Sequence, residues 1–187
     1  PEFLHDLNGF FALAIHDAEK DELFLARDRF GIKPLLWCRT GSELHFASEL
    51  KGLLALGAPV RKNLDAEWIY FRHHYVPAPA TILADVFKLE PGHAFQVSNR
   101  GQQPFRWYDL DRAVQRSSKP GPLPSKELFE LFDDSVRLRL ISDVPIGTFL
   151  SGGLDSSIVS ALAIRHKKDL RTFSIGYADD PYFDESG

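Results

Sequence analysis

The chain has 187 residues, of which 44% are hydrophobic and 26% are charged, and its formal net charge at pH 7 is −4. These proportions are typical of a globular protein with a sizeable core and argue against a disordered chain. The acidic balance is untypical of a nucleic-acid-binding surface. No apolar run approaches the roughly 20 residues of a membrane-spanning helix, and a single cysteine excludes an internal disulfide. We therefore expect a cytoplasmic protein with neither a nucleic-acid nor a membrane partner.

The N-terminal part of the chain reads as β-rich. Apolar runs bounded by polar turns predict strands at residues 10–16, 22–27, 32–38, 43–48, 94–97 and 105–108. The first two runs are apolar on both faces, which predicts burial between layers. A short helix through Leu50 is expected to end at Gly57, and a second helix can be capped by Asn63 or Asp65.

A change of composition follows this β-rich part. Residues 111–124 contain three prolines and two serines, which favours a linker. We place the linker at residues 113–124, between domains at 1–112 and 125–187. The second domain begins with a helix capped by Ser125. The expected elements after it are a buried strand at 146–150, a loop at 151–155, a helix at 156–166 and a strand at 171–176, which is the order of a parallel α/β unit.

The loop of this unit carries the clearest chemical signal in the chain. Gly152 and Gly153 let the backbone approach a bound anion, because glycine has no side chain. The helix that follows offers unpaired N–H groups and the positive end of its dipole. Hydroxyl groups of Ser151, Ser156 and Ser157 surround the same turn. The sequence therefore predicts a phosphate-binding loop.

Asp155 needs a separate explanation, because a carboxylate repels phosphates. A Mg²⁺ ion bridging the carboxylate and the phosphate oxygens removes this conflict. The loop is not the common mononucleotide loop, which requires a lysine after its glycines. The alternative is a simple strand-to-helix turn capped by a serine or an aspartate.

Several segments together resemble glutamine-dependent asparagine synthetases. The sequence SGGLDS, with residues 143–147 (DVPIG) before it and 172–176 (TFSIG) after it, is similar to the family's pyrophosphate loop. Residues 26–35 (ARDRFGIKPL) resemble the signature of its glutaminase domain. Further similarity lies at residues 46–51, 75–82 and 89–93. These segments occur in the family's order, which is more specific than any one of them.

The resemblance implies a mixed α+β and α/β fold. The N-terminal part would be the back half of an Ntn-type glutaminase domain, with antiparallel sheets between helices, followed by the start of a parallel α/β nucleotide-binding domain. The implied enzyme is a carbon–nitrogen ligase that amidates aspartate with ammonia from glutamine. ATP and Mg²⁺ are its cofactors, and an aspartyl-AMP intermediate yields AMP and pyrophosphate. A homodimer is one candidate assembly of the full-length protein.

The resemblance also assigns site residues. Leu150 and Ile175 match backbone positions that line the adenine nucleotide, and Asp155 matches a Mg²⁺ ligand that acts through the pyrophosphate. The implied nucleotide-binding residues are Leu150, Ser151, Gly152, Gly153, Leu154, Asp155, Ser156, Ser157 and Ile175. The chain opens on Pro1 and contains no methionine, so we expect an internal fragment. No catalytic residue is expected within it, because the family's nucleophilic cysteine would precede Pro1 and its aspartate site would follow Gly187.

Other candidate residues have simpler interpretations. Cys38 is expected to be a buried or half-buried thiol rather than a nucleophile. Asp28 and Arg29 are expected to fix the turn before Gly31. The adjacent pair at residues 73–74 is a poor metal chelator, because neighbouring helical residues point in different directions. Two rival functions stay open: a related amide- or lactam-forming synthetase with another carboxylate substrate, and a non-catalytic binding module with the same fold.

Overall fold

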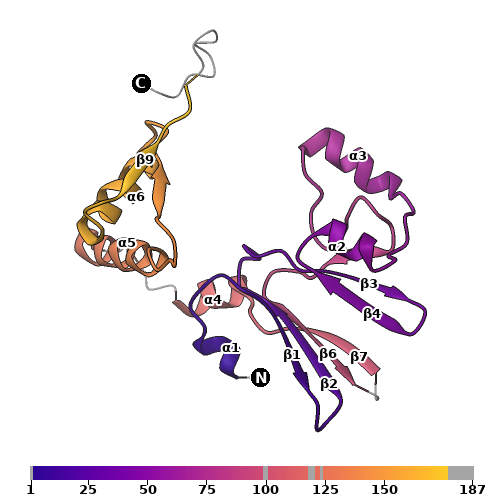
Figure 1. The fold of residues 1–187 in the computed structure, drawn as a ribbon. Helices are drawn as coiled ribbons and strands as arrows, with labels where there is room; N and C mark the ends of the chain where they lie inside the picture. The colour runs from indigo at the N-terminus through magenta and orange to yellow at the C-terminus, as the bar shows by residue number, and fades with distance from the viewer. Residues whose placement is uncertain (1, 99–100, 118–120, 123, 177–187) are drawn as a thin grey trace. The chain divides into compact units, whose positions relative to one another are not determined.

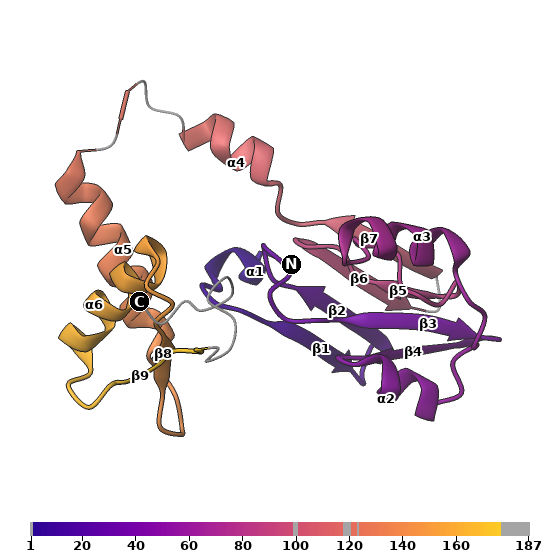
Figure 2. The ribbon, with the colours of Figure 1, turned by 90° about the horizontal axis from the view of Figure 1, so that it is seen from above.

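The computed structural model describes the chain except for residues 1, 99–100, 118–120, 123 and 177–187 (Figures 1 and 2). The chain divides into two compact units, Pro1–Ser118 and Lys119–Gly187. Within the described residues, no helix is both long and apolar enough to cross a membrane.

Two antiparallel sheets form the first unit. One sheet has the order β1-β2-β6-β7, with strands Ala12–Asp17, Glu22–Arg27, His93–Ser98 and Gly101–Arg106. The other has the order β4-β3-β5, with strands Glu43–Ala47, Leu36–Thr40 and Val86–Lys88. Every strand pair in both sheets is antiparallel.

Alternating side chains along the strands build three core layers, because successive residues of a strand point to opposite faces. Leu25 and Phe95 belong to a buried cluster that both sheets share. On the outer face of the first sheet, Ala26 and Ala94 pack with Leu4 of helix α1 (Phe3–Asp6).

Helix α2 (Leu50–Ala55) covers the outer face of the second sheet, where its Leu53 packs with Cys38 and Val86. The layers are therefore helix, sheet, sheet and helix. This arrangement confirms the expected fold of antiparallel sheets between helices.

Several strand predictions need correction, and the strand expected at residues 105–108 is observed as β7, at Gly101–Arg106. The run at residues 10–16 was expected to be buried on both faces, but β1 begins at Ala12 and Ile15 is 45% exposed. The reason is that β1 lies at the edge of its sheet and the four-residue helix α1 covers only part of the outer face. The third strand was expected from residue 32 but begins at Leu36, because the preceding residues form a side-chain-bonded loop described below.

Two further helices complete the first unit. Helix α3 (Leu64–His73) begins after Asn63, whose side chain accepts a hydrogen bond from the Ala66 N–H at 3.1 Å. Helix α4 (Leu110–Ser117) extends into the segment that was expected to be a linker. The Asp109 carboxylate caps it by accepting a bond from the Arg112 N–H at 3.1 Å. The prolines that follow this helix favoured the prediction of a linker, so neither the helix nor its cap was expected.

The second unit is built from helix α5 (Ser125–Arg139), strand β8 (Gly147–Phe149), helix α6 (Leu154–His166) and strand β9 (Arg171–Phe173). The two strands pair in parallel, which agrees with the predicted order of strand, loop, helix and strand. The prediction that the first of these strands is buried is wrong: Phe149 is 74% exposed. Among the described residues, β9 is the only strand paired with β8, so much of the β8 surface is left uncovered.

Candidate functional site: the glycine loop between strand β8 and helix α6

The two units carry one prominent motif each, and the motif of the first unit is internally bonded. The Asp28 side chain is only 1% exposed. Its two carboxylate oxygens accept hydrogen bonds from four backbone N–H groups, those of Phe11, Phe30, Ile32 and Lys33, at 3.3, 3.1, 3.0 and 2.9 Å. A buried carboxylate requires this kind of compensation. Asp28 therefore fixes the turn, as the sequence predicted.

Arg27 bonds the same loop from its other side. Its guanidinium donates to the carbonyl oxygens of Lys33 at 2.8 Å, Gly31 at 2.6 Å and Leu89. Burial lowers the pKa of Arg27, and the nearby charge of Asp28 opposes that shift. Arg29 donates to the carbonyl oxygens of His5 and Leu7, both at 2.8 Å, and so ties α1 to this loop. The motif is a structural clamp.

The glycine loop of the second unit differs in its exposure. Ser151, Gly152 and Gly153 are all exposed, and they join the end of β8 to the start of α6. Gly152 has a φ of +74°, a left-handed conformation that favours glycine. A Cβ added at Gly153 would lie 3.6 Å from the Ser151 Oγ, which is an ordinary contact distance, so a small group fits at this position without displacing its neighbours.

Hydroxyl groups hold the shape of this loop. The Ser156 and Ser157 hydroxyls donate to the Gly153 carbonyl oxygen at 3.0 and 2.8 Å. Ser156 Oγ also accepts a bond from the Ser151 N–H at 3.2 Å and lies 3.1 Å from Ser151 Oγ. The sequence proposed these hydroxyls as donors to a phosphate. In the structure, Ser156 and Ser157 direct their protons to the loop itself.

The start of α6 offers polar groups that the described part of the chain does not use. No side chain caps this helix, so its first-turn N–H groups are left for another acceptor. Asp155 lies in this first turn, is exposed, and makes no hydrogen bond or ion pair within the described part of the chain. Unpaired N–H groups can donate hydrogen bonds to a phosphate, and the neighbouring carboxylate can coordinate the divalent cation that accompanies the phosphate.

The described residues contain no group of three or more side chains that could hold a metal ion by themselves. A Mg²⁺ ion at Asp155 would therefore take its other ligands from phosphate oxygens and water, which is its usual preference. The exposed position of Asp155 fits that role.

The remaining predicted residues lie at the same edge of the unit. The Leu150 N–H donates to the Phe173 carbonyl oxygen at 2.8 Å, and the Ser174 hydroxyl donates to the Leu150 carbonyl oxygen at 2.5 Å. These bonds hold Leu150 beside the segment that leads to Ile175, which is 60% exposed. Leu154 is 76% exposed at the start of α6. The structure thus brings the nine predicted residues to the carboxyl end of the two parallel strands.

Two side-chain interactions that support the second unit could not be predicted from the sequence. Thr148 Oγ1 lies 2.9 Å from Ser160 Oγ, which fastens β8 to α6 from a buried position. Asp133 of α5 lies 3.0 Å from His166 Nε2, at the end of α6. No sequence pattern indicates either pair, because the partners of each pair lie in different secondary-structure elements and are far apart in the chain.

The other candidates behave as structural residues. Cys38 is fully buried, and burial raises the pKa of its thiol, which confirms the prediction of a buried cysteine. It faces His45 across the β3–β4 pair, a proximity that the sequence could not show. His73 is the last residue of α3, whereas His74 has a left-handed backbone with a φ of +59°.

Comparison with known proteins identifies both parts of the chain. Residues 1–108 match the family model of the glutamine amidotransferase domain, and residues 127–187 match that of asparagine synthase. Among solved structures, glutamine phosphoribosylpyrophosphate amidotransferase from B. subtilis matches 91% of this chain and 33% of its own, with 15% identity and a TM-score of 0.38. A similarity this low adds nothing to the fold described above.

Three curated relatives illustrate the sequence match. Asparagine synthetase [glutamine-hydrolyzing] 1 of Bacillus subtilis is 36% identical over 91% of this chain. A putative asparagine synthetase of Methanocaldococcus jannaschii is 38% identical over 95% of it, and asparagine synthetase B of Escherichia coli is 32% identical over 97%. The chain spans 27%, 36% and 30% of these proteins. It belongs to the glutamine amidotransferase domain family through residues 1–108, and its residues 127–187 are similar to asparagine synthase.

Proposed function

We propose that the protein containing this chain makes asparagine from aspartate, with ATP as the activating substrate and glutamine as the source of ammonia. One observation carries the proposal: the exposed glycine loop joins β8 to an uncapped α6 in a chain whose N-terminal part belongs to the glutamine amidotransferase family. The match of residues 127–187 to asparagine synthase supports the choice of product.

In this proposal the second unit binds the phosphates of ATP. The backbone N–H groups of Gly152 and Gly153 and the first-turn N–H groups of α6 face the pyrophosphate, and the exposure of the glycines and the lack of a side-chain cap among the described residues support this role. The Leu150 backbone and Ile175 line the adenine nucleotide. Ser156 and Ser157 keep the loop in shape through the Gly153 carbonyl.

Asp155 is the proposed Mg²⁺ ligand. When bound, the ion neutralises phosphate charge that would otherwise repel the carboxylate. Asp155 contributes a fixed negative charge at the helix start, and the N–H groups beside it contribute the opposite polarity. Together they orient the two terminal phosphates as the leaving group.

The proposed chemistry solves one difficulty, which is that a carboxylate is a poor electrophile. The aspartate side-chain oxygen attacks the α-phosphorus of ATP, and the bond to the β-phosphate oxygen breaks to release pyrophosphate. Ammonia then attacks the resulting aspartyl-AMP carbonyl, and AMP leaves as the amide forms. Residues of this chain bind the departing pyrophosphate. They do not include the ammonia-releasing nucleophile, because Cys38 is buried among apolar side chains.

The test is pyrophosphate release by the full-length protein supplied with ATP, aspartate and an ammonium salt, which bypasses glutamine hydrolysis. We expect release that depends on aspartate. Gly152→Val should abolish it, because the new side chain occupies the approach to the phosphates and the backbone conformation disfavours valine. Gly9→Val is the matched control, since a Cβ at Gly9 meets nothing within 4 Å.

Three outcomes would contradict the proposal. Release that depends on another carboxylate instead of aspartate would favour a related synthetase. The absence of any ATP-dependent release would favour a binding module. Wild-type activity in Gly152→Val would show that the loop is only a turn.

A further inference from the structure

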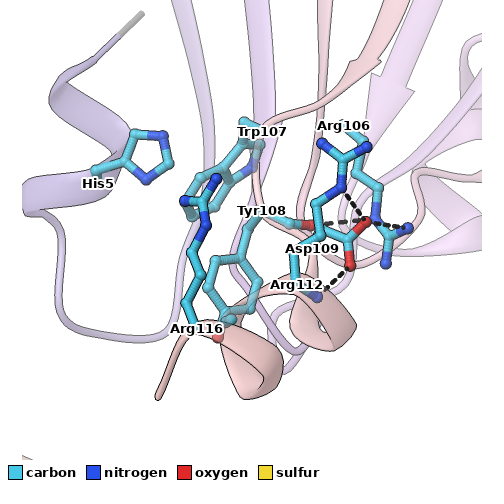
Figure 3. Close-up of a pocket in the computed structure, with 8 residues that line it drawn as sticks. His5, Arg106, Trp107, Tyr108, Asp109, Arg112 and Arg116 are labelled. Atoms are coloured by element: carbon cyan, nitrogen blue, oxygen red, sulfur yellow. Dashed lines mark hydrogen bonds and ion pairs between the residues drawn. The ribbon is translucent and has the colours of Figure 1, made fainter. Parts of the chain in front are cut away.

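A cavity of about 510 Å³ lies in the first unit and is lined by residues of helix α1, of the segment that follows β7 and of helix α4 (Figure 3). Its lining is rich in polar and charged groups. The residues that matter are His5, Arg106, Trp107, Asp109, Arg112 and Arg116. Its volume lies within the range of roughly 300–1,000 Å³ that small-molecule sites occupy.

The charges of the lining do not balance. Three arginines against one aspartate give a formal charge of +2. Asp109 lies 3.0 Å from Arg106 Nη1 and 3.7 Å from Arg112 Nε, so it holds two of the arginines. The Arg112 N–H and the charges of both arginines lower the pKa of Asp109, which keeps this carboxylate ionised near neutral pH.

Arg116 is the unbalanced group. It has no hydrogen bond or ion pair with any part of the chain that the structure describes. In Figure 3 its side chain extends from α4 toward Trp107 and His5. A cationic side chain held at a cavity without a protein partner is available to an anion from solution.

The orientation of α4 strengthens this point. Asp109, Arg112, Ala113 and Arg116 follow helical spacing and line the cavity. The apolar side chain of Leu110 is 45% exposed, outside this lining. An amphipathic helix ordinarily turns its apolar face inward. The charged face of α4 therefore lines this cavity without being needed for apolar packing.

The geometry points to a binding site for a phosphate monoester in this cavity. A monoester carries close to two negative charges at neutral pH, which matches the +2 of the lining, whereas a monocarboxylate carries one. Arginine guanidinium groups bind phosphate oxygens through paired N–H donors. The cavity is larger than a phosphate group alone, which leaves room for the organic part of a small metabolite. This site belongs to the first unit, whereas the loop proposed to bind ATP belongs to the second, and the inference does not depend on that proposal.

Calorimetric titration of the protein with glycerol 3-phosphate at low ionic strength tests the site. Arg116→Gln should weaken binding about tenfold to a hundredfold, the effect of one lost charge-assisted contact. Asp109→Asn should tighten binding, because it releases Arg106 and Arg112 while the amide oxygen can still cap α4. Arg39→Gln, which removes an exposed arginine from β3 outside the cavity, is the matched control and should bind like the wild type.

The opposite responses of the two cavity variants separate the proposal from simple damage to α4, which would weaken binding in both. Unchanged binding in Arg116→Gln, or no binding by the wild type, would overturn the proposal. Loss of binding in Gly152→Val, with normal binding in Arg116→Gln, would place the phosphate at the glycine loop instead. Equal affinity for acetate would overturn the choice of a phosphate monoester.

Discussion

Asp28 in the first unit and Asp155 in the second occupy opposite environments, although both lie in segments that the sequence marks as motifs. Asp28 is 1% exposed and accepts four backbone hydrogen bonds. Asp155 is exposed and has no described partner. The comparison teaches that a motif with a charged residue can either stabilise the fold or bind a ligand. The two roles differ in how many of the motif's polar groups lack a hydrogen-bond partner within the protein.

The same contrast extends to the glycines. At Gly31 an added Cβ would lie 2.9 Å from Arg27 Cζ and from Pro91 Cγ, so the protein itself fills the space. At Gly153 the nearest atom would be 3.6 Å away, within ordinary contact distance. The first loop therefore has no room for an added Cβ, whereas the second accommodates one without displacing a neighbour.

The largest expected effect is on stability and uses the same substitution in both motifs. Asp28→Asn should lower the free energy of unfolding by about 2–4 kcal/mol. The amide has only one oxygen to accept the four hydrogen bonds, and its NH₂ group would face backbone N–H donors. Asp155→Asn should change it by less than about 0.5 kcal/mol, as is usual for a surface substitution. Urea denaturation measures both. Equal stability of the two variants would break the comparison.

A smaller effect is expected from alanine at two left-handed glycines. Gly31→Ala and Gly41→Ala share the backbone strain of a positive φ, +65° and +62°, which costs about 1 kcal/mol. Gly31→Ala should cost about 1–3 kcal/mol more, because Arg27 is held by three carbonyls and cannot move away. A Cβ at Gly41 meets nothing within 4 Å. Equal melting temperatures of Gly31→Ala and Gly41→Ala would show that the Arg27 side chain can move to accommodate the added methyl group.

The smallest effect concerns Cys38, whose burial raises the pKa of its thiol. Cys38→Ala should cost about 1 kcal/mol of stability and leave glutamine hydrolysis by the full-length protein unchanged. A thiol reagent at pH 8 should react with the native protein far more slowly than with the urea-unfolded chain, because the buried thiol is inaccessible and its raised pKa disfavours the reactive thiolate. Fast native labelling, or loss of glutamine hydrolysis, would show that the thiol is functional.

Local patterns predicted most of the fold correctly. The strand Glu22–Arg27 has the bounds expected from its apolar run, and the helix after Asn63 uses one of the two proposed caps. The glycine loop lies between a strand and a helix as its residue types require. These features depend on residues that are neighbours in the chain, which is the information a single sequence contains.

Features that depend on distant partners were missed or misjudged. The exposure of Phe149 depends on how many strands join β8, and the start of β3 at Leu36 depends on bonds that Arg27 and Asp28 make to the preceding residues. The serine hydroxyls were expected to serve a phosphate, but their position relative to the Gly153 carbonyl decides their hydrogen bonds. Sequence spacing alone determines none of these contacts.

The affinity of the full-length protein for Mg·ATP, measured in wild type and in Asp155→Asn, tests the central claim most directly. The substitution is nearly isosteric and removes only the negative charge at the start of α6. We expect the dissociation constant to rise about tenfold to a hundredfold while the free energy of unfolding stays the same. A wild-type dissociation constant for Asp155→Asn would contradict the claim that this exposed loop, unlike the buried Asp28 loop, is built for a ligand.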